Sequence, residues 1–279
     1  MIAIIANPKA HRFSHNKLKA IIDTLKRQYS VDVFFTKKPK EGTAIANDIA
    51  GLYKIIAIYG GDGIINEVIN ADLKDSAVAV LPAGTTNVLA IELFGSPSIK
   101  LSVDAILKGK TKTAFTAKIN DKYFILMAGA GFDGLSVKLV NNRLKHFSGK
   151  LAYVAAGIKA YLKPNKCFEA EIDGKKFNVL WAIATNASVY AGKFRISRST
   201  NIFDNNLEVL LFDCKNPIFA LPYYNSVLFF LNRFRMPCFK RIKTQKVLFK
   251  GCTIQIDGDL YEQNYGEIKI SKPIKIIVP

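Results

Sequence analysis

The sequence predicts a two-domain protein, in which an N-terminal α/β domain is followed by a β-rich domain. Its 279 residues exceed the usual size of a single domain. Strand-like and helix-like patterns alternate through the first 118 residues, and strand-like patterns dominate afterwards. The alternating order indicates a parallel sheet with helices on both faces, whereas the later run of strands indicates a mostly antiparallel domain.

Four strands and the helices between them account for the first domain. Short apolar runs predict buried strands at 2–7, 31–36, 54–60 and 77–82. Ser14 is placed to cap the helix after the first strand, and Thr43 is placed to cap the helix after the second. One further helix is expected after each of the remaining two strands. The first domain is therefore expected to cover residues 1–117.

The second domain, 118–279, is predicted from runs of strand residues separated by turns. The runs lie at 113–120, 122–129, 167–173, 175–186, 207–213, 246–251, 252–258 and 267–279. Helices are expected at 149–163 and around 225–234. The final strand, near 270–279, is expected either to stay in this domain or to return to the first.

The net charge is the strongest compositional signal, because 40 Lys and Arg residues stand against 22 Asp and Glu residues, giving +18. Such a surface attracts nucleic acid or an anionic bilayer, although a merely solvated basic surface is the simpler alternative. No nucleic-acid recognition motif is present, so nucleic acid is not an expected partner. The first apolar run is too short for a signal peptide, and no membrane span is seen, so we expect a cytoplasmic protein.

A glycine-rich turn at residues 60–63 follows the third strand and leads into a helix. Glycine lets backbone N–H groups approach a bound anion, and the helix presents its positive end to the same anion. Asp62 would be repelled by phosphates unless it holds a metal ion or orients a nucleophile. Asn66 and Glu67 are expected to serve the metal or the loop. The alternative is an ordinary tight turn in which Asp62 caps a helix.

A second turn, at residues 84–87, follows the fourth strand and supplies hydroxyl, amide and backbone groups. Both turns should open at the carboxyl edge of one parallel sheet, where ligands bind in such folds. Other nucleotide motifs are absent: residues 109–111 end like a P-loop without its first glycine, and there is no GxGxxG, HRD or DFG. Together the two turns indicate phosphate handling.

GGDG followed by INE, and then PAGTTN, resemble the diacylglycerol kinase catalytic-domain family, which includes bacterial soluble lipid kinases and the sphingosine kinases. The resemblance continues through IIANP, AGAGFDG, the GKxxYxxA pattern at Gly149 and IDGD at 256–259, and so covers nearly the whole chain. It implies a Rossmann-like domain and a β-sandwich-like domain, with ATP in a cleft between them.

The resemblance also implies roles for particular residues. Those expected to contact ATP or its Mg²⁺ are Asn7, Thr36, Gly60, Gly61, Asp62, Gly63, Asn66, Glu67, Gly84, Thr85 and Asn87. Asp259 is expected to accept the proton of the lipid hydroxyl, with Asp257 as the alternative. Asp204 matches a magnesium position, with Asn201 and Asn206 as carbonyl donors.

Three positions depart from the family pattern. Ile64 replaces an expected threonine, Asp259 replaces a glutamate, and Asn205 replaces a glycine. A carboxylate still occupies each key position, which favours activity.

The sequence therefore predicts an ATP-dependent kinase that phosphorylates diacylglycerol or a related lipid alcohol at the inner face of the membrane. The apolar and then cationic stretch at 216–243 is expected to dock on the membrane or admit lipid, the alternative being a core helix. A kinase of a soluble nucleotide, similar to NAD kinases, and an inactive lipid- or nucleotide-binding regulator are the alternative functions. A homodimer is one possible assembly.

Overall fold

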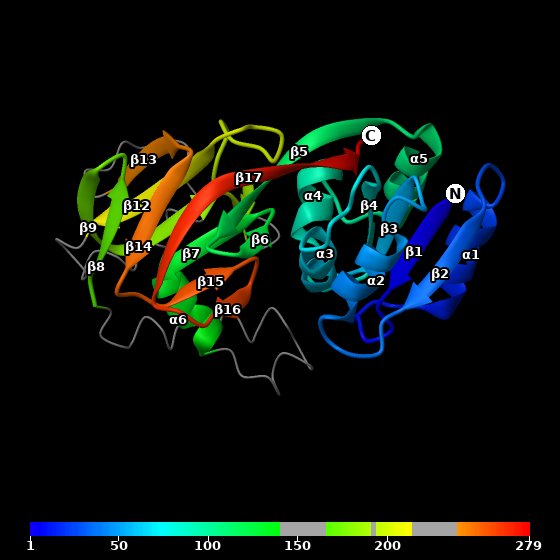
Figure 1. Cartoon of the computed structure of the whole chain (residues 1–279), viewed down its shortest axis with the longest axis horizontal. Coiled ribbons are helices and arrows are strands. Elements are labelled where there is room, and N and C mark those ends of the chain that lie inside the picture. The colour runs from blue at the N-terminus through cyan, green and yellow to red at the C-terminus, as the bar shows by residue number, and fades with distance from the viewer. Residues whose placement is uncertain (140–165, 191–193, 214–238) are drawn as a thin grey trace. The chain divides into compact units, whose positions relative to one another are not determined.

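A computed structural model describes residues 1–139, 166–190, 194–213 and 239–279 (Figure 1). The chain forms two compact units. The first contains Met1–Phe115 and Lys272–Pro279, and the second contains the described parts of Thr116–Tyr190 and Phe194–Ser271. The predicted helices at 149–163 and 225–234, and residues 216–238 of the predicted docking stretch, lie outside the described residues.

The first unit is built on a parallel sheet, as predicted. Its strands run in the order β2 (Val31–Phe35), β1 (Ile2–Ala6), β3 (Ile55–Gly60) and β4 (Ala77–Pro82). The end of β17 (Tyr265–Ile277) pairs in parallel with β4, where Ile276 lies opposite Val78. The end of the last strand of the chain thus joins the parallel sheet of the first unit.

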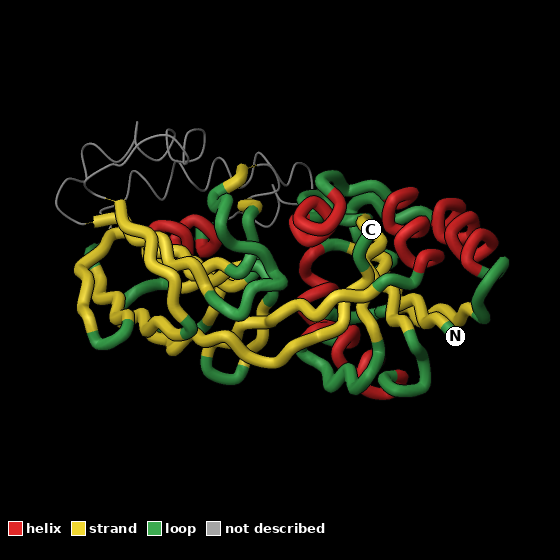
Figure 2. The backbone as a smooth tube through the Cα atoms, turned by 90° about the horizontal axis from the view of Figure 1, so that it is seen from above, coloured by secondary structure: helices red, strands yellow, loops and turns green. Residues whose placement is uncertain are grey.

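Helices cover both faces of this sheet (Figure 2). The buried side chains of α1 (His15–Leu25) and α5 (Ile99–Lys108) share one apolar core with Ile2 and Ile4. Because side chains alternate along a strand, Ala3 and Ile5 point to the opposite face, where they are also fully buried. On that face α2 (Glu41–Ile49) lies against β1, and α3 (Asp62–Ile69) lies against β3.

The predicted helix caps have different outcomes. Ser14 caps α1, since its side chain accepts a hydrogen bond from the Lys17 N–H, so that prediction is confirmed. The prediction for Thr43 is wrong, because α2 begins at Glu41 and the Thr43 hydroxyl donates to the Glu67 carbonyl oxygen at 2.7 Å.

A carboxylate from another helix caps α2 instead. The two carboxylate oxygens of Glu67 accept from the Lys40 and Gly42 N–H groups, each at 2.9 Å. A partner on α3 therefore satisfies N–H groups at the start of α2, in place of a local side-chain cap.

One predicted helix after the second turn proves to be two. α4 (Val88–Phe94) ends at Gly95, whose φ of +72° lies in the left-handed region that favours glycine. Ser98 then begins α5 by accepting from the Leu101 N–H. This break was not predicted, although a glycine followed two residues later by Pro97 is typical of a helix end.

The second unit is β-rich, as predicted. Its larger strands are β5 (Thr111–Ile119, which begins in the first unit), β6 (Lys122–Phe124), β7 (Met127–Gly131), β8 (Phe168–Ile172), β9 (Lys175–Thr185), β12 (Leu207–Asp213), β13 (Phe239–Thr244), β14 (Lys246–Lys250), β15 (Ile254–Ile256), β16 (Asp259–Tyr261) and most of β17. Short strands β10 (Val189–Tyr190) and β11 (Phe194–Arg195) pair with each other. Strand β13 and the short helix α6 (Phe132–Lys138) were not predicted.

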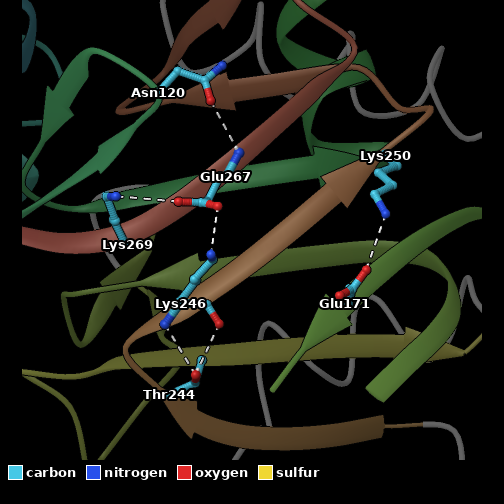
Figure 3. Close-up of polar contacts among 7 residues, drawn as sticks. All are labelled: Asn120, Glu171, Thr244, Lys246, Lys250, Glu267 and Lys269. Atoms are coloured by element: carbon cyan, nitrogen blue, oxygen red, sulfur yellow. Dashed lines mark hydrogen bonds and ion pairs between the residues drawn. The ribbon is translucent and has the colours of Figure 1, made fainter. Parts of the chain in front are cut away.

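Charged side chains on β14 and β17 compensate one another (Figure 3). Lys246 and Lys269 are direct cross-strand partners, a like-charge pair that would be unfavourable alone. The Glu267 carboxylate lies 2.7 Å from the Lys246 ammonium and 3.4 Å from that of Lys269. The hydrogen bond from Lys246 is the main cause that lowers the pKa of Glu267. Lys250 likewise contacts Glu171 at 3.2 Å on the neighbouring strand β8.

Candidate functional site

The two glycine turns of the first unit are in backbone contact. A Cβ atom placed on Gly84 would lie 2.5 Å from the Gly61 Cα, and one placed on Gly61 would lie 3.1 Å from the Gly84 Cα. Neither position has room for a side chain. The β3–α3 and β4–α4 turns, predicted to open at the same sheet edge, therefore meet there.

The start of α3 has no side-chain cap among the described residues, so its first N–H groups are available to an anion. Gly61 is its N-cap residue, and no side chain accepts a hydrogen bond at that cap. Gly63, in the first turn, is exposed and has no atom within 4 Å of the position that a Cβ would occupy. A helix N-terminus with open N–H groups favours an anion.

Two side chains of the second turn behave differently. The Thr85 hydroxyl is partly exposed and has no hydrogen-bond partner in the part of the chain that the structure describes. Asn87 is buried, has a φ of 51°, and closes the turn on itself: its side chain accepts from the Gly84 N–H at 2.7 Å and donates to the Gly84 carbonyl at 2.9 Å. Thr85 is therefore available to a ligand, whereas Asn87 shapes the turn.

Asp62 points toward the second turn and caps α4. Its carboxylate accepts from the Thr86 hydroxyl at 3.0 Å and from the Val88 and Leu89 N–H groups at 3.1 and 3.3 Å. Asp62 belongs to α3 but satisfies the N-terminus of a different helix. A capping role for Asp62 was one of the predicted alternatives, but neither this helix nor a partner for Thr86 was predicted.

The remaining predicted residues of the first unit surround or support these turns. Asn7 lies beside Gly60, since a Cβ on Gly60 would be 3.6 Å from the Asn7 Cβ. Thr36 is buried at the end of β2, where its N–H donates to the Ala6 carbonyl. Asn66 accepts from the Asn70 side chain, at both its carbonyl oxygen and its Oδ1. Glu67, as described above, holds α2.

Ile64, which replaces the expected threonine, is 4% exposed and packs into the interior. A Cβ on Gly60 would lie 2.4 Å from the Ile64 Cγ2, and one on Gly42 would lie 3.3 Å from its Cγ1. The side chain at this position thus fills the space between β3 and α2.

The second unit separates the two aspartates of the IDGD motif. Asp257 and Gly258 form the two-residue turn between β15 and β16, with φ values of 47° and 90°. The Asp257 carboxylate accepts from the N–H groups of Ile125, Leu126 and Met127 at 2.9 to 3.0 Å. These bonds interrupt the strand that was predicted at 122–129, so it forms β6 and β7 instead.

Asp259 is the first residue of β16 and is exposed. No hydrogen bond or ion pair reaches its carboxylate from the described residues. Asp257 is therefore occupied in holding the backbone of residues 125–127, whereas the Asp259 carboxylate is available to a ligand.

A buried polar group that the sequence analysis did not assign lies behind this turn. Gln255 donates from Nε2 to Asp133 Oδ2 at 2.7 Å and accepts at Oε1 from the Gly258 N–H at 2.8 Å. The Tyr190 hydroxyl donates to Asp133 Oδ1. Burial raises the pKa of the Asp133 carboxyl, against the opposing effect of hydrogen bonds from Tyr190 and Gln255. The AGAGFDG motif contains Asp133, but nothing in it indicates Gln255 as a partner.

The predicted magnesium position is a compact loop before β12. The Asn201 N–H donates to Asp204 Oδ2 at 3.2 Å, and the Asp204 N–H donates to the Asn201 carbonyl at 3.0 Å. Asn206 is exposed at the end of the loop. Within the described ranges, no group of three or more His, Cys, Asp or Glu side chains could together hold a metal ion.

Residues 1–119, which contain both glycine turns, match the family model of the diacylglycerol kinase catalytic domain. The resemblance to that family is confirmed. A diacylglycerol kinase of Bacillus subtilis strain 168 is 29% identical over 220 residues, which are 75% of this chain and 72% of that protein. A putative lipid kinase of Staphylococcus aureus strain MRSA252 is 29% identical over 137 residues, 48% of this chain and 45% of that protein. The chain thus spans less than half the length of the staphylococcal relative that it matches.

Solved structures show the same fold. A putative diacylglycerol kinase from Bacillus anthracis superposes with a TM-score of 0.82 at 19% identity, covering 100% of this chain and 97% of that one. An NAD kinase from Archaeoglobus fulgidus, solved in complex with ATP, superposes with a TM-score of 0.53 at 14% identity, covering 99% and 93%. The predicted mixed α/β fold is therefore confirmed, and at these identities the likeness concerns the fold alone.

We predict that Asp62→Asn lowers the free energy of unfolding by about 1–3 kcal/mol even without nucleotide, because an amide nitrogen would face N–H donors at the start of α4. Urea unfolding followed by circular dichroism measures this change. Thr85→Ala is the control, and we expect it to change stability by less than about 0.5 kcal/mol. Equal stability of Asp62→Asn and the parent protein would contradict the capping role.

We predict a pH-dependent effect of Asp133→Asn on stability. The pKa of Asp133 is higher in the folded protein than in the unfolded chain, so this group favours folding most at low pH. Its contribution is lost as the pH rises through the folded-state pKa. Urea unfolding from about pH 4 to about pH 8 should therefore show Asp133→Asn gaining stability relative to the parent as pH rises. A constant difference would mean that the Asp133 pKa is not raised by folding.

Proposed function

We propose that this protein transfers the γ-phosphoryl group of ATP to the hydroxyl of diacylglycerol or a related lipid alcohol. The observation that carries the proposal is the pair of glycine turns in contact, within the segment that matches the diacylglycerol kinase catalytic domain. The open start of α3 beside that contact supports binding of a phosphate chain at the same place.

The groups available to ATP are the N–H groups at the start of α3, including that of exposed Gly63, and the Thr85 hydroxyl. Donors fixed before the ligand arrives stabilise developing charge without reorganising. In this proposal these donors bind and orient the phosphates. Gly61 and Gly84, which lack side chains, allow the two turns to approach each other.

The residues present also fit a Mg²⁺ ion that arrives with ATP. Mg²⁺ is usually held by one or two carboxylates together with substrate phosphates, rather than by a complete protein cage. Asp62 accepts three hydrogen bonds, which leaves capacity for one further contact on its two oxygens. Asp62 would hold the ion, which when bound neutralises negative charge on the β- and γ-phosphates.

Asp259 is the better proton acceptor of the two candidates. Asp257 already accepts three backbone N–H groups, and protonating it would weaken the bonds that hold residues 125–127. In the proposed step the lipid oxygen bonds to the γ-phosphorus, the bond to the β,γ-bridging oxygen breaks, and ADP leaves. The hydroxyl proton passes to the exposed Asp259 carboxylate.

The two other functions predicted from the sequence are less well supported. A soluble nucleotide acceptor is favoured only by the fold shared with the archaeal NAD kinase, whose sequence is 14% identical. An inactive regulator was suggested partly by Ile64, but that side chain packs into the interior beside Gly60 and Gly42.

We also propose that the protein acts at the inner face of an anionic membrane without spanning it. Among the described residues, no helix is long and apolar enough to cross a bilayer. The net charge of +18 would attract an anionic surface, at about 1 kcal/mol per Lys or Arg close to it.

We predict that label from ATP, supplied with Mg²⁺, passes to a lipid alcohol in mixed micelles, and that Asp259→Asn lowers kcat by about 10²–10⁴-fold. The panel would include diacylglycerol, phosphatidylglycerol, a sphingoid base and NAD. Glu262→Gln, an exposed carboxylate just beyond β16, is the matched control and should retain activity. Label in NADP would favour the soluble-nucleotide alternative, and ATP binding without transfer to any acceptor would favour the regulator.

We predict that the protein cosediments with vesicles containing anionic lipid and that raising salt from about 0.05 M to about 0.5 M releases it, since exposed charges are screened. Replacing Phe229 and Phe230 by serine should weaken binding further at either salt concentration. Phe35→Ser is the control, because Phe35 is an exposed phenylalanine of the first unit. A folded double variant that bound such vesicles as well as the parent would contradict the docking role of 216–243.

A further inference from the structure

The two-residue turn before Asp259 is held at both of its residues by hydrogen bonds that involve side chains. Asp257 fixes one end through three hydrogen bonds to residues 125–127. Gly258 is fixed by its N–H, which donates to Gln255 Oε1 at 2.8 Å. Since Asp259 pairs with Ile256 across this turn, the position of its backbone follows from the position of the turn.

The Gln255 amide is held in one orientation. The side chain is buried, at 3% exposed, and its Nε2 donates to Asp133 Oδ2 at 2.7 Å. Because the ionised Asp133 carboxylate can only accept there, the nitrogen faces it and the oxygen faces the Gly258 N–H. Asp133 is in turn held by the Tyr190 hydroxyl. A chain of hydrogen bonds therefore runs from β10 through α6 to the turn.

Gly129 of β7 makes room for this pair. A Cβ atom on Gly129 would lie 1.6 Å from Asp133 Oδ2 and 2.7 Å from Gln255 Nε2. The φ of Gly129 lies outside the left-handed region, so its backbone does not require glycine. The space is occupied by the Asp133 carboxylate and the Gln255 amide, and this explains why a residue without a side chain is needed in the middle of a buried strand.

Stability alone does not account for the arrangement. A buried carboxylate costs free energy of desolvation, and well-packed apolar residues of similar volume are often as stable or more stable. The Asp133–Gln255 pair instead fixes the direction of the Gly258 N–H, next to the exposed carboxylate of Asp259.

We propose that Gln255 is a positioning residue for the proton acceptor Asp259 and that Asp133 sets its orientation. The inference rests on the proposed function, since it assumes that Asp259 accepts the proton. Without the bond to Gly258 the turn can rotate, and a displacement of about 1 Å at a reacting group can cost about 10²-fold in rate.

The test compares Gln255→Met with Gln263→Met. The first removes both hydrogen bonds with little change of volume; the second removes an exposed glutamine beyond β16 that accepts from the Asn120 side chain at 3.0 Å. Gln255→Met should lower kcat about 10–100-fold with the KM for ATP changed less than about twofold, and the Gly258 amide should exchange with deuterium faster. Gln263→Met should change none of these.

Variants at Asp133 separate orientation from charge. In Asp133→Asn the side-chain oxygen can still accept from Gln255 while its nitrogen donates to the Tyr190 oxygen, so kcat should stay within about threefold of the parent. Asp133→Leu removes the acceptor and should behave like Gln255→Met. The double variant that combines Gln255→Met with Asp133→Leu should have a kcat no lower than either single variant, because both changes act through the same bond to Gly258.

Three results would overturn the inference. The first is an active parent whose kcat is unaffected by a folded Gln255→Met variant. The second is a Gly258 amide whose exchange rate is unchanged in that variant. The third is additive losses in the double variant. A parent protein that transfers no phosphate to any lipid would overturn the proposed function itself, and the inference with it. An active parent with an unaffected Gln255→Met would overturn the inference alone.

Discussion

The contact between the α-carbons of Gly61 and Gly84 is the constraint on which the first unit's site depends. Two turns that leave neighbouring strands of a parallel sheet come within reach of each other only if neither carries a side chain at this point. Their contact brings the Asp62 carboxylate to the start of α4, where it replaces the missing local cap. The same geometry leaves the start of α3 without a cap and therefore open to an anion.

Most acidic side chains in the sequence motifs accept hydrogen bonds from the backbone of another segment. Asp62 holds α4, Glu67 holds α2, and Asp257 holds the segment between β6 and β7. In each case a carboxylate accepts N–H groups that would otherwise be unpaired, and such bonds are among the stronger ones in proteins. Against this background the exposed Asp259 differs, since no described residue donates to its carboxylate. That difference is the structural reason why we propose Asp259 as the proton acceptor.

Local patterns predicted most strands of both units and most helices of the first unit correctly, because burial on a sheet requires apolar runs that can be read directly. Several errors arose where a distant residue decides the local outcome. Thr43 does not cap α2, because Glu67 is brought there by the packing of α3. The strand predicted at 122–129 divides because Asp257, about 130 residues later, takes its N–H groups. The hydrogen bond between Asp133 and Gln255 could not be predicted from local patterns either, since the two residues are separated by 122 positions in the sequence.

The shortened acid at position 259 makes accurate placement of the turn more important. A glutamate, as in the motif that this segment resembles, has an additional rotatable bond and can adjust its reach when the backbone shifts. Aspartate lacks that freedom, so the position of its carboxylate follows the backbone of the turn more closely. The turn is held on one side by Asp257 and on the other by Gln255, which leaves the Asp259 backbone little room to move. A carboxylate with short reach on a tightly held turn is preorganised, and the loss of either constraint should matter more here than in a chain with glutamate at this position.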